Sequence, residues 1–251
     1  MKVIGRHRGR LGEIVIWENQ TNGTRFYLEG DIFQSHATPT GESQFTYVRV
    51  MESFLANSTN VLLLGCGGGN LATMLARSGK TVTVVDHNPS SFDIAHQYFG
   101  MPDDIPCIIE DFRTYLPTET QQFDGIAIDV GGPGFCFEEQ FDSATCYSIK
   151  SRLAPGGRII MNMLVGSDFD PAPDKIGAQL SDDHLDAWIF DQPGFRHRNA
   201  LIACLAKRDR ESSKRRVAEF SNTDEVNWTL RRPRWRSNRV PPISIEITSS
   251  G

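Results

Sequence analysis

The sequence predicts an α/β fold in which helices cover both faces of a mostly parallel sheet, with a small antiparallel β domain in front of it. Between residues 61 and 161, short apolar segments alternate with helical ones, which is the pattern of strand–helix repeats in parallel sheets. Residues 9–37 instead indicate short hairpin strands. A chain of 251 residues is long enough for one large domain with a small additional one.

The N-terminal part of the chain carries hairpin signals. Residues 13–17 are rich in β-branched and aromatic side chains, and Asn22 with Gly23 marks a tight turn before a second strand at 25–28. Within residues 42–56 the apolar side chains recur every three or four positions, which predicts a helix.

The central part predicts strands that alternate with helices. One helix is expected over residues 70–77. A second starts at Pro89 with Asn88 as its cap, and a third covers 141–153, where a Pro-Gly-Gly sequence at 155–157 would stop it. The expected strands are 61–64, 81–85, 107–109, 125–128, 158–161 and 201–205.

Composition and charge argue against several classes of function. The net charge of −5 argues against a nucleic-acid partner, because phosphate binding needs a basic surface. The apolar runs are too short to cross a bilayer. The five cysteines and six histidines show no metal-ligand spacing, so we expect no metal site. We therefore expect a cytoplasmic protein without nucleic-acid or membrane partners.

The strongest local signal is a glycine-rich turn after the strand at 61–64. Gly65, Gly67 and Gly69 lead from that strand into the next helix. Glycines let the backbone approach a ligand closely, and the first amides of a helix are free to bind it. Asp86 ends the following strand, where a carboxylate can bind both hydroxyls of a ribose. Together these residues predict a Rossmann-like site for a nucleoside-bearing cofactor; a plain turn with a capping aspartate is the alternative.

Two further aspartates follow strands. Asp111 comes after the third strand, where its side chain could reach a base, and Asp129 comes after the fourth, at the edge where open α/β sheets bind ligands. Either could instead cap a helix or face solvent.

A G-x-G-x-x-A match that begins at Gly67 fits a dinucleotide site as well. However, the turn itself begins at Gly65, and nothing separately indicates a nicotinamide site, so an oxidoreductase is the least favoured interpretation.

With these motifs, the sequence resembles the spermidine synthase family of polyamine aminopropyltransferases over residues 12–206. The resemblance includes the N-terminal hairpins and the segment 28–34 that ends in Gln34, which simple methyltransferases usually lack. It also includes the glycine turn, the strand-end acids and the segment 129–133. It implies a methyltransferase-type Rossmann-like fold, decarboxylated S-adenosylmethionine or S-adenosylmethionine as co-substrate, no metal, and a small amine as acceptor.

The resemblance also implies roles for individual residues. Gln34 would contact the amino-acid-derived part of the cofactor, Asp86 the ribose and Asp111 the adenine amino group. Asp129 would act on the attacking amine, and residues 130–140 would form a gate over the site. Because a free alkylamine has a pKa of about 10 and arrives protonated, a carboxylate can attract it, orient it and accept its proton.

The substrate motifs depart from the family pattern. Gly132 stands where the family has a second aspartate, directly before Pro133. In the acceptor segment Glu42 and an aromatic residue are retained, and both Phe45 and Tyr47 are candidates for the family tyrosine. We take Glu42, Tyr47 and Gly132 as the substrate-binding positions. The missing carboxylate argues against putrescine as the acceptor and leaves cofactor binding intact.

We therefore expect a spermidine-synthase-like transferase of polyamine biosynthesis that moves an aminopropyl group to an amine and acts as a homodimer. The alternatives are a methyltransferase that uses S-adenosylmethionine on a small molecule, and a nucleoside-binding protein without turnover. The expected domains are an N-terminal β-hairpin domain with its connecting helix at 1–56, the cofactor-binding catalytic domain at 57–207, and an extended basic tail at 208–251.

Overall fold

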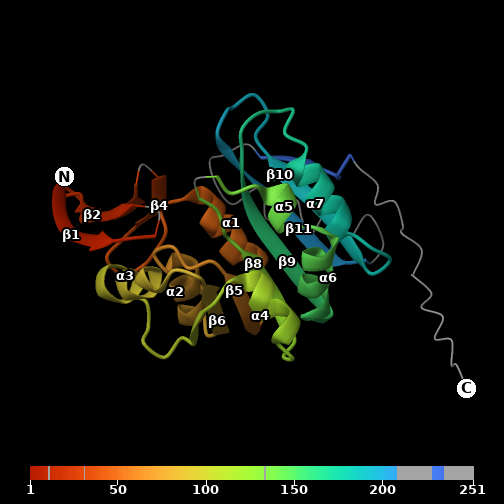
Figure 1. Cartoon of the computed structure of the whole chain (residues 1–251), viewed down its shortest axis with the longest axis horizontal. Coiled ribbons are helices and arrows are strands. Elements are labelled where there is room, and N and C mark those ends of the chain that lie inside the picture. The colour runs from red at the N-terminus through yellow and green to blue at the C-terminus, as the bar shows by residue number, and fades with distance from the viewer. Residues whose placement is uncertain (11, 31, 133, 208–227, 235–251) are drawn as a thin grey trace, which may run out of the picture.

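The computed structural model describes residues 1–10, 12–30, 32–132, 134–207 and 228–234. These residues form a four-stranded antiparallel sheet and an eight-stranded sheet, and helices lie on both faces of the larger one (Figure 1). The fold class expected from the sequence is therefore confirmed, including the separate N-terminal sheet.

The small sheet has the strand order β1-β2-β3-β4. Its turn at Asn22 and Gly23 forms as predicted, because Gly23 takes a φ of +75° that side chains rarely adopt. The inward face, with Ile14, Ile16 and Tyr27, packs on helix α3 (Pro89–Phe99). The expected hairpin strands began at residue 9, and the structure adds a first strand before them, which pairs antiparallel with the second. The strands are β1 (Lys2–Arg8), β2 (Glu13–Glu18), β3 (Arg25–Glu29) and β4 (Ile32–Ala37).

The large sheet has the order β12-β10-β11-β9-β8-β5-β6-β7. The strands from β9 to β7 in this order pair in parallel, whereas β10, β11 and β12 are antiparallel. The first six are β5 (Asn60–Leu64), β6 (Thr81–Asp86), β7 (Cys107–Ile109), β8 (Phe123–Ile128), β9 (Leu153–Val165) and β10 (Leu185–Asp191). The remaining two are β11 (Arg198–Ala206) and β12 (Thr229–Arg231).

Helices cover both faces because the central strands are apolar on both sides. Val61 and Leu63 of β5 face a cluster that includes α1, α2 and α3, whereas Leu62 and Leu64 face α4, α6 and α7. This alternation is the property of a strand buried on both faces. The helices are α1 (Thr46–Phe54), α2 (Asn70–Arg77), α3 (Pro89–Phe99), α4 (Phe112–Thr118), α5 (Phe137–Gln140), α6 (Ser143–Ser151) and α7 (Ala172–Leu180).

The helix caps explain where the predicted boundaries were right and where they shifted. Asn88 caps α3 as predicted, since its side chain accepts a hydrogen bond from the amide of Ser90 at 3.2 Å. Helix α6 begins at Ser143 rather than at residue 141, because Asp142 accepts from the amide of Thr145 at 2.8 Å. The Pro-Gly-Gly sequence at 155–157 does not end the element there but lies within β9.

The sequence did not predict α4, α5 or α7. Pro117 lies inside α4, and two prolines open α7. Proline favours a loop interpretation, although it is tolerated in the first turn of a helix.

The C-terminal segment was expected as an extended tail from residue 208 onward. Within the described part, Thr229–Arg231 instead forms β12 and pairs antiparallel with β10, so this piece of the expected tail belongs to the sheet. Residues 208–227 and 235–251, which hold most of the expected basic tail, and Pro133 of the expected gate lie outside the described residues. None of the helices in the described ranges combines the length and the apolar character needed to span a membrane.

Candidate active site

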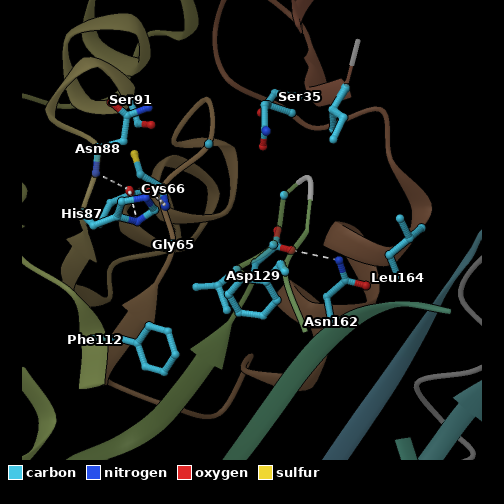
Figure 2. Close-up of a pocket in the computed structure, with 18 of the residues that line it drawn as sticks. Ser35, Gly65, Cys66, His87, Asn88, Ser91, Phe112, Asp129, Asn162 and Leu164 are labelled. Atoms are coloured by element: carbon cyan, nitrogen blue, oxygen red, sulfur yellow. Dashed lines mark hydrogen bonds and ion pairs between the residues drawn. The ribbon is translucent and has the colours of Figure 1, made fainter. Parts of the chain in front are cut away.

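A cavity of about 710 Å³ opens at the carboxyl ends of the parallel strands, between the two sheets. This volume lies within the range of small-molecule sites, about 300–1,000 Å³. We call the part beside β5, β6 and β7 the nucleoside half and the part beside β8, β9 and α7 the acceptor half. The nucleoside half includes Gly65, Gly67, Asp86, His87, Asp111 and Phe112; the acceptor half includes Asp129, Gly132, Glu138, Asn162, Leu164, Asp170 and Ala172. Figure 2 shows Gly65, His87 and Phe112 on one side of the pocket and Asn162 and Leu164 on the other.

The glycine turn brings the ends of β5 and β8 together. Gly65 has a φ of +95°, and a Cβ there would overlap the carbonyl oxygen of Asp129. Gly67 also has a positive φ, +53°, and a Cβ there would lie 3.3 Å from the hydroxyl oxygen of Ser35. The same hydroxyl accepts a hydrogen bond from the amide of Gly68 at 2.8 Å. The turn is thereby attached to β4, which places Gln34 at the cavity wall.

Gly69 has a different role from the other two glycines. It does not line the cavity and has a left-handed φ of +69° at the start of α2. A Cβ at this position would lie 2.6 Å from the sulfur of Met101 and 2.7 Å from the Cβ of Ala95. Gly69 therefore permits close packing of α2 against α3, and the structure does not bring it to the site at which the sequence interpretation placed it.

Asp86 lies at the end of β6 with its side chain only 11% exposed. One carboxylate oxygen accepts from the amide of Cys66 at 2.7 Å and the other from the amide of Asn88 at 2.8 Å. Burial raises the pKa of this carboxyl group, and the two backbone hydrogen bonds oppose the shift. The amides fix the orientation of the carboxylate, which lines the cavity where a ribose is expected.

Asp111 caps a helix and also lines the cavity. It accepts from the amide of Arg113 at 2.9 Å, and it forms an ion pair with the guanidinium of Arg113, also at 2.9 Å. The hydrogen bond from the Arg113 side chain lowers the pKa of Asp111. The cap that the sequence interpretation considered as an alternative is therefore present. Since both carboxylate oxygens are engaged, only their remaining lone pairs could reach an adenine amino group.

Asp129 follows β8 and reaches the centre of the cavity wall. One carboxylate oxygen accepts from the side-chain amide of Asn162 at 2.9 Å, and the other accepts from the hydroxyl of Tyr47 at 3.3 Å (Figure 2 shows the first bond). Burial by the surrounding protein raises the pKa of Asp129, and these two hydrogen bonds oppose the rise. A carboxylate in such a place is a stronger proton acceptor than one in water.

The structure selects between the two aromatic candidates in the acceptor segment. The hydroxyl of Tyr47 contacts Asp129, while Phe45 stacks on Tyr47 with ring centroids 5.7 Å apart. Both residues line the cavity. Glu42, by contrast, is exposed and lines a separate groove of about 470 Å³ that also includes Arg49 and Glu52. The structure therefore does not bring Glu42 to the substrate site that the sequence interpretation assigned it to.

Gly132 and α5 lie in the segment that was expected to form a gate. Gly132 lines the cavity, and Glu138 of α5 does so as well, with its carboxylate paired to the ammonium of Lys175 on α7 at 2.7 Å. Among the residues that the structure describes, no group of three or more His, Cys, Asp or Glu side chains is arranged to hold a metal ion.

Asn162 is the main site residue that sequence reasoning missed. It is 8% exposed within the apolar run 159–165 of β9, and its side-chain oxygen is buried without a hydrogen-bond partner. A single amide inside an apolar run is the signal that could have found it, because such a group needs a buried partner.

Comparison with known proteins defines the class of this fold. Residues 61–157 match a family model described as a methyltransferase domain. A probable spermidine synthase from Corynebacterium glutamicum superimposes with a TM-score of 0.76 at 18% identity, covering 94% of this chain and 92% of its own. The spermidine synthase from Thermotoga maritima gives 0.62 at 17% identity, with 91% and 81% covered. The N-methyltransferase NodS from Bradyrhizobium japonicum gives 0.50 at 19% identity, with 65% and 86% covered.

The sequence is also similar to that of a curated protein. A probable polyamine aminopropyl transferase of Bifidobacterium longum is 30% identical over 115 residues, which are 45% of this chain and 26% of that protein. The match thus spans about a quarter of the length of that relative. Together, the fold and this match confirm the resemblance to spermidine synthases that the sequence indicated.

Proposed function

We propose that this chain is a spermidine-synthase-like transferase that moves an aminopropyl group from decarboxylated S-adenosylmethionine to an amine. The observation that carries the proposal is the carboxylate of Asp129, held by Tyr47 and Asn162 on the wall of a cavity whose other half is lined by the glycine turn and Asp86. The spermidine-synthase-like fold and the match to an aminopropyl transferase support it.

The nucleoside half has the groups that such a co-substrate needs. Asp86 offers a fixed carboxylate to the ribose hydroxyls, and Asp111 and Phe112 line the cavity where the base would lie. Gly67 leaves the backbone open to close approach of the ligand. Gln34 lines the cavity on β4, where we propose that it contacts the aminopropyl end.

Asp129 acts on the acceptor. A sulfonium co-substrate supplies an electrophilic carbon next to its positive sulfur. The carboxylate attracts the ammonium form of the acceptor, accepts one of its protons and leaves the nitrogen lone pair facing that carbon. Attack by the nitrogen forms the carbon–nitrogen bond and breaks the carbon–sulfur bond. The electron pair of the broken bond returns to the sulfur, and 5′-methylthioadenosine leaves as a neutral thioether. Because burial raises the pKa of Asp129, the carboxylate holds the transferred proton more strongly than an exposed aspartate would.

Methyl transfer from S-adenosylmethionine is the second candidate. The methyltransferase family model over residues 61–157 and the likeness to an N-methyltransferase favour it. The same carboxylate could orient an amine for methyl transfer, so the two reactions differ in which group leaves the sulfonium.

The test is a calorimetric titration with both sulfonium compounds, followed by mass spectrometry of amines incubated with each. We expect aminopropyl addition from the decarboxylated compound. Exclusive methyl addition would select the second candidate, and binding without any transfer would indicate a non-catalytic protein. In Asp129→Asn we expect turnover to fall about 10²–10⁴-fold, with nucleoside affinity within a few-fold of wild type.

We further propose a homodimer and a cytoplasmic location. Light scattering of the purified protein tests the first, and fractionation of cells tests the second.

A further inference from the structure

The acceptor half offers one recognition point for a cationic nitrogen. Asp129 and Asn162 are joined by a hydrogen bond, and the side-chain oxygen of Asn162 is buried without a partner. Figure 2 shows this oxygen turned away from Asp129, toward the side on which Leu164 lies. Because this oxygen has almost no exposed surface, an ammonium group at this point would donate its hydrogen bond to the carboxylate of Asp129, which lines the cavity.

The other carboxylates of the acceptor half are already engaged. Glu138 is neutralised by Lys175 at 2.7 Å. Asp170 accepts from the amide of Ala172 at 3.0 Å and from that of Gly166 at 3.5 Å, at the beginning of α7, where the helix dipole also balances its charge. At position 132 the chain has a glycine. A second ammonium group would lose its water here without gaining a free anionic partner.

The remaining surface of the acceptor half is apolar or neutral. Phe45, Leu164 and Ala172 line the cavity, and Asn199, the cross-strand neighbour of Leu164, is uncharged. Of the cavity-lining apolar residues, Leu164 is 56% exposed. Such a surface favours hydrocarbon over a charged group.

We propose that the acceptor is an amine with a single cationic nitrogen and an apolar alkyl or aryl body, and that it is not a diamine. This inference rests on the proposed function and names the substrate class of the same site. The nitrogen lies against the carboxylate of Asp129, which Asn162 orients, and the apolar body lies against Phe45, Leu164 and Ala172.

The first test compares two ligands of equal length, n-pentylamine and putrescine. Each is titrated calorimetrically into protein saturated with 5′-methylthioadenosine, the nucleoside that remains after aminopropyl transfer. We expect n-pentylamine to bind at least about tenfold more tightly. Equal or tighter binding of putrescine overturns the inference, and so does failure of both amines to bind. Transfer assays report separately on the proposed function: transfer to putrescine in preference to n-pentylamine would retain that function and overturn this inference.

The second test removes the cation that pairs with Glu138. In Lys175→Met the glutamate loses its cation, so we expect the preference to shift toward putrescine by about tenfold. The matched control is Lys150→Met, which breaks a similarly half-buried pair, with Asp182, away from the cavity. Thermal unfolding of both variants verifies that they fold. An unchanged preference in Lys175→Met, or the same shift in the control, overturns the inference.

Discussion

The nucleoside half of the cavity is built mainly from backbone and from residues close together in the sequence, whereas the acceptor half depends on side chains from distant elements. Gly65 and Asp86 are separated by one helix and one strand, and Asp86 is fixed by backbone amides. Asp129 is instead fixed by Tyr47, which lies 82 residues away, and by Asn162, which lies 33 residues away. A few substitutions in the acceptor half can therefore change which acceptor binds, while the nucleoside half continues to bind the same class of ligand.

The largest expected effect concerns the support of the acceptor half by the C-terminal strand. Arg231 of β12 pairs with the buried Asp174 of α7, and its guanidinium lies 3.9 Å from Asp191. In Arg231→Leu these carboxylates lose a cationic partner, so we expect unfolding free energy to fall by about 3–5 kcal/mol. Urea denaturation measures this loss.

The control for that variant is Arg6→Leu. Arg6 pairs with Glu13 on the surface, with both side chains more than half exposed, so we expect a loss of at most about 1 kcal/mol. Equal losses in the two variants would refute the buried role of Arg231. If Arg231→Leu also weakens nucleoside binding by more than a few-fold, the two halves are not independent.

The glycine turn gives the next largest effect. In Gly65→Ala the new methyl group overlaps the carbonyl oxygen of Asp129, and the φ of +95° disfavours any side chain, so we expect a loss of about 2–4 kcal/mol. Gly79→Ala is the matched control: its φ is +80°, but no atom lies within 4 Å of the new Cβ, and the expected loss is about 1 kcal/mol. If the two variants lose the same unfolding free energy, the turn at Gly65 moves enough to accommodate the methyl group, and the close approach to Asp129 is not required.

The contrast between the two halves also shows which parts of the site the sequence could predict. The strand, turn and helix around Gly65 and the strand-end acid Asp86 are local patterns, and both residues line the cavity. Gly69 and Glu42 were assigned to the site by spacing and resemblance. In the structure Gly69 instead packs against α3, and Glu42 lines a surface groove beside α1. Asn162, the Glu138–Lys175 pair and β12 depend on the register of distant elements, which no local pattern specifies.

Asp86→Ala isolates the nucleoside half. Removal of the carboxylate takes away a charge-assisted hydrogen bond to the ribose, so we expect nucleoside binding to weaken by about 1.5–3 kcal/mol. Calorimetric titration with 5′-methylthioadenosine measures it, and circular dichroism verifies that the variant is folded. Because the amides of Cys66 and Asn88 also lose their acceptor, Asp86→Asn serves as a second variant that can still accept one of these bonds. Unchanged affinity in both folded variants would exclude a ribose contact.

The smallest expected effect is the loss of unfolding free energy that the buried carboxylate of Asp129 causes in the acceptor half. Burial raises the folded-state pKa of Asp129 above its value in the unfolded chain, so the stability associated with its protonated form is present at low pH and is lost as the pH rises through the folded pKa. Asparagine stays neutral, so we expect Asp129→Asn to be about 0.5–2 kcal/mol more stable than wild type at pH 7. The difference should shrink on acidification toward the unfolded pKa of about 3.9.

Asp124→Asn provides a control of opposite sign. Burial tends to raise the pKa of Asp124, but hydrogen bonds from Thr59 and Asn60 outweigh it and lower the pKa. Its ionised form therefore contributes stability above the unfolded pKa, which is lost as the pH falls through the folded one. This variant should be less stable than wild type at pH 7, and that gap should also close in acid. Urea denaturation at several pH values measures both. If Asp129→Asn is destabilised like Asp124→Asn, the hydrogen bonds of Asp129 outweigh its burial, and the acceptor half then contains a stabilising carboxylate instead of a strained base.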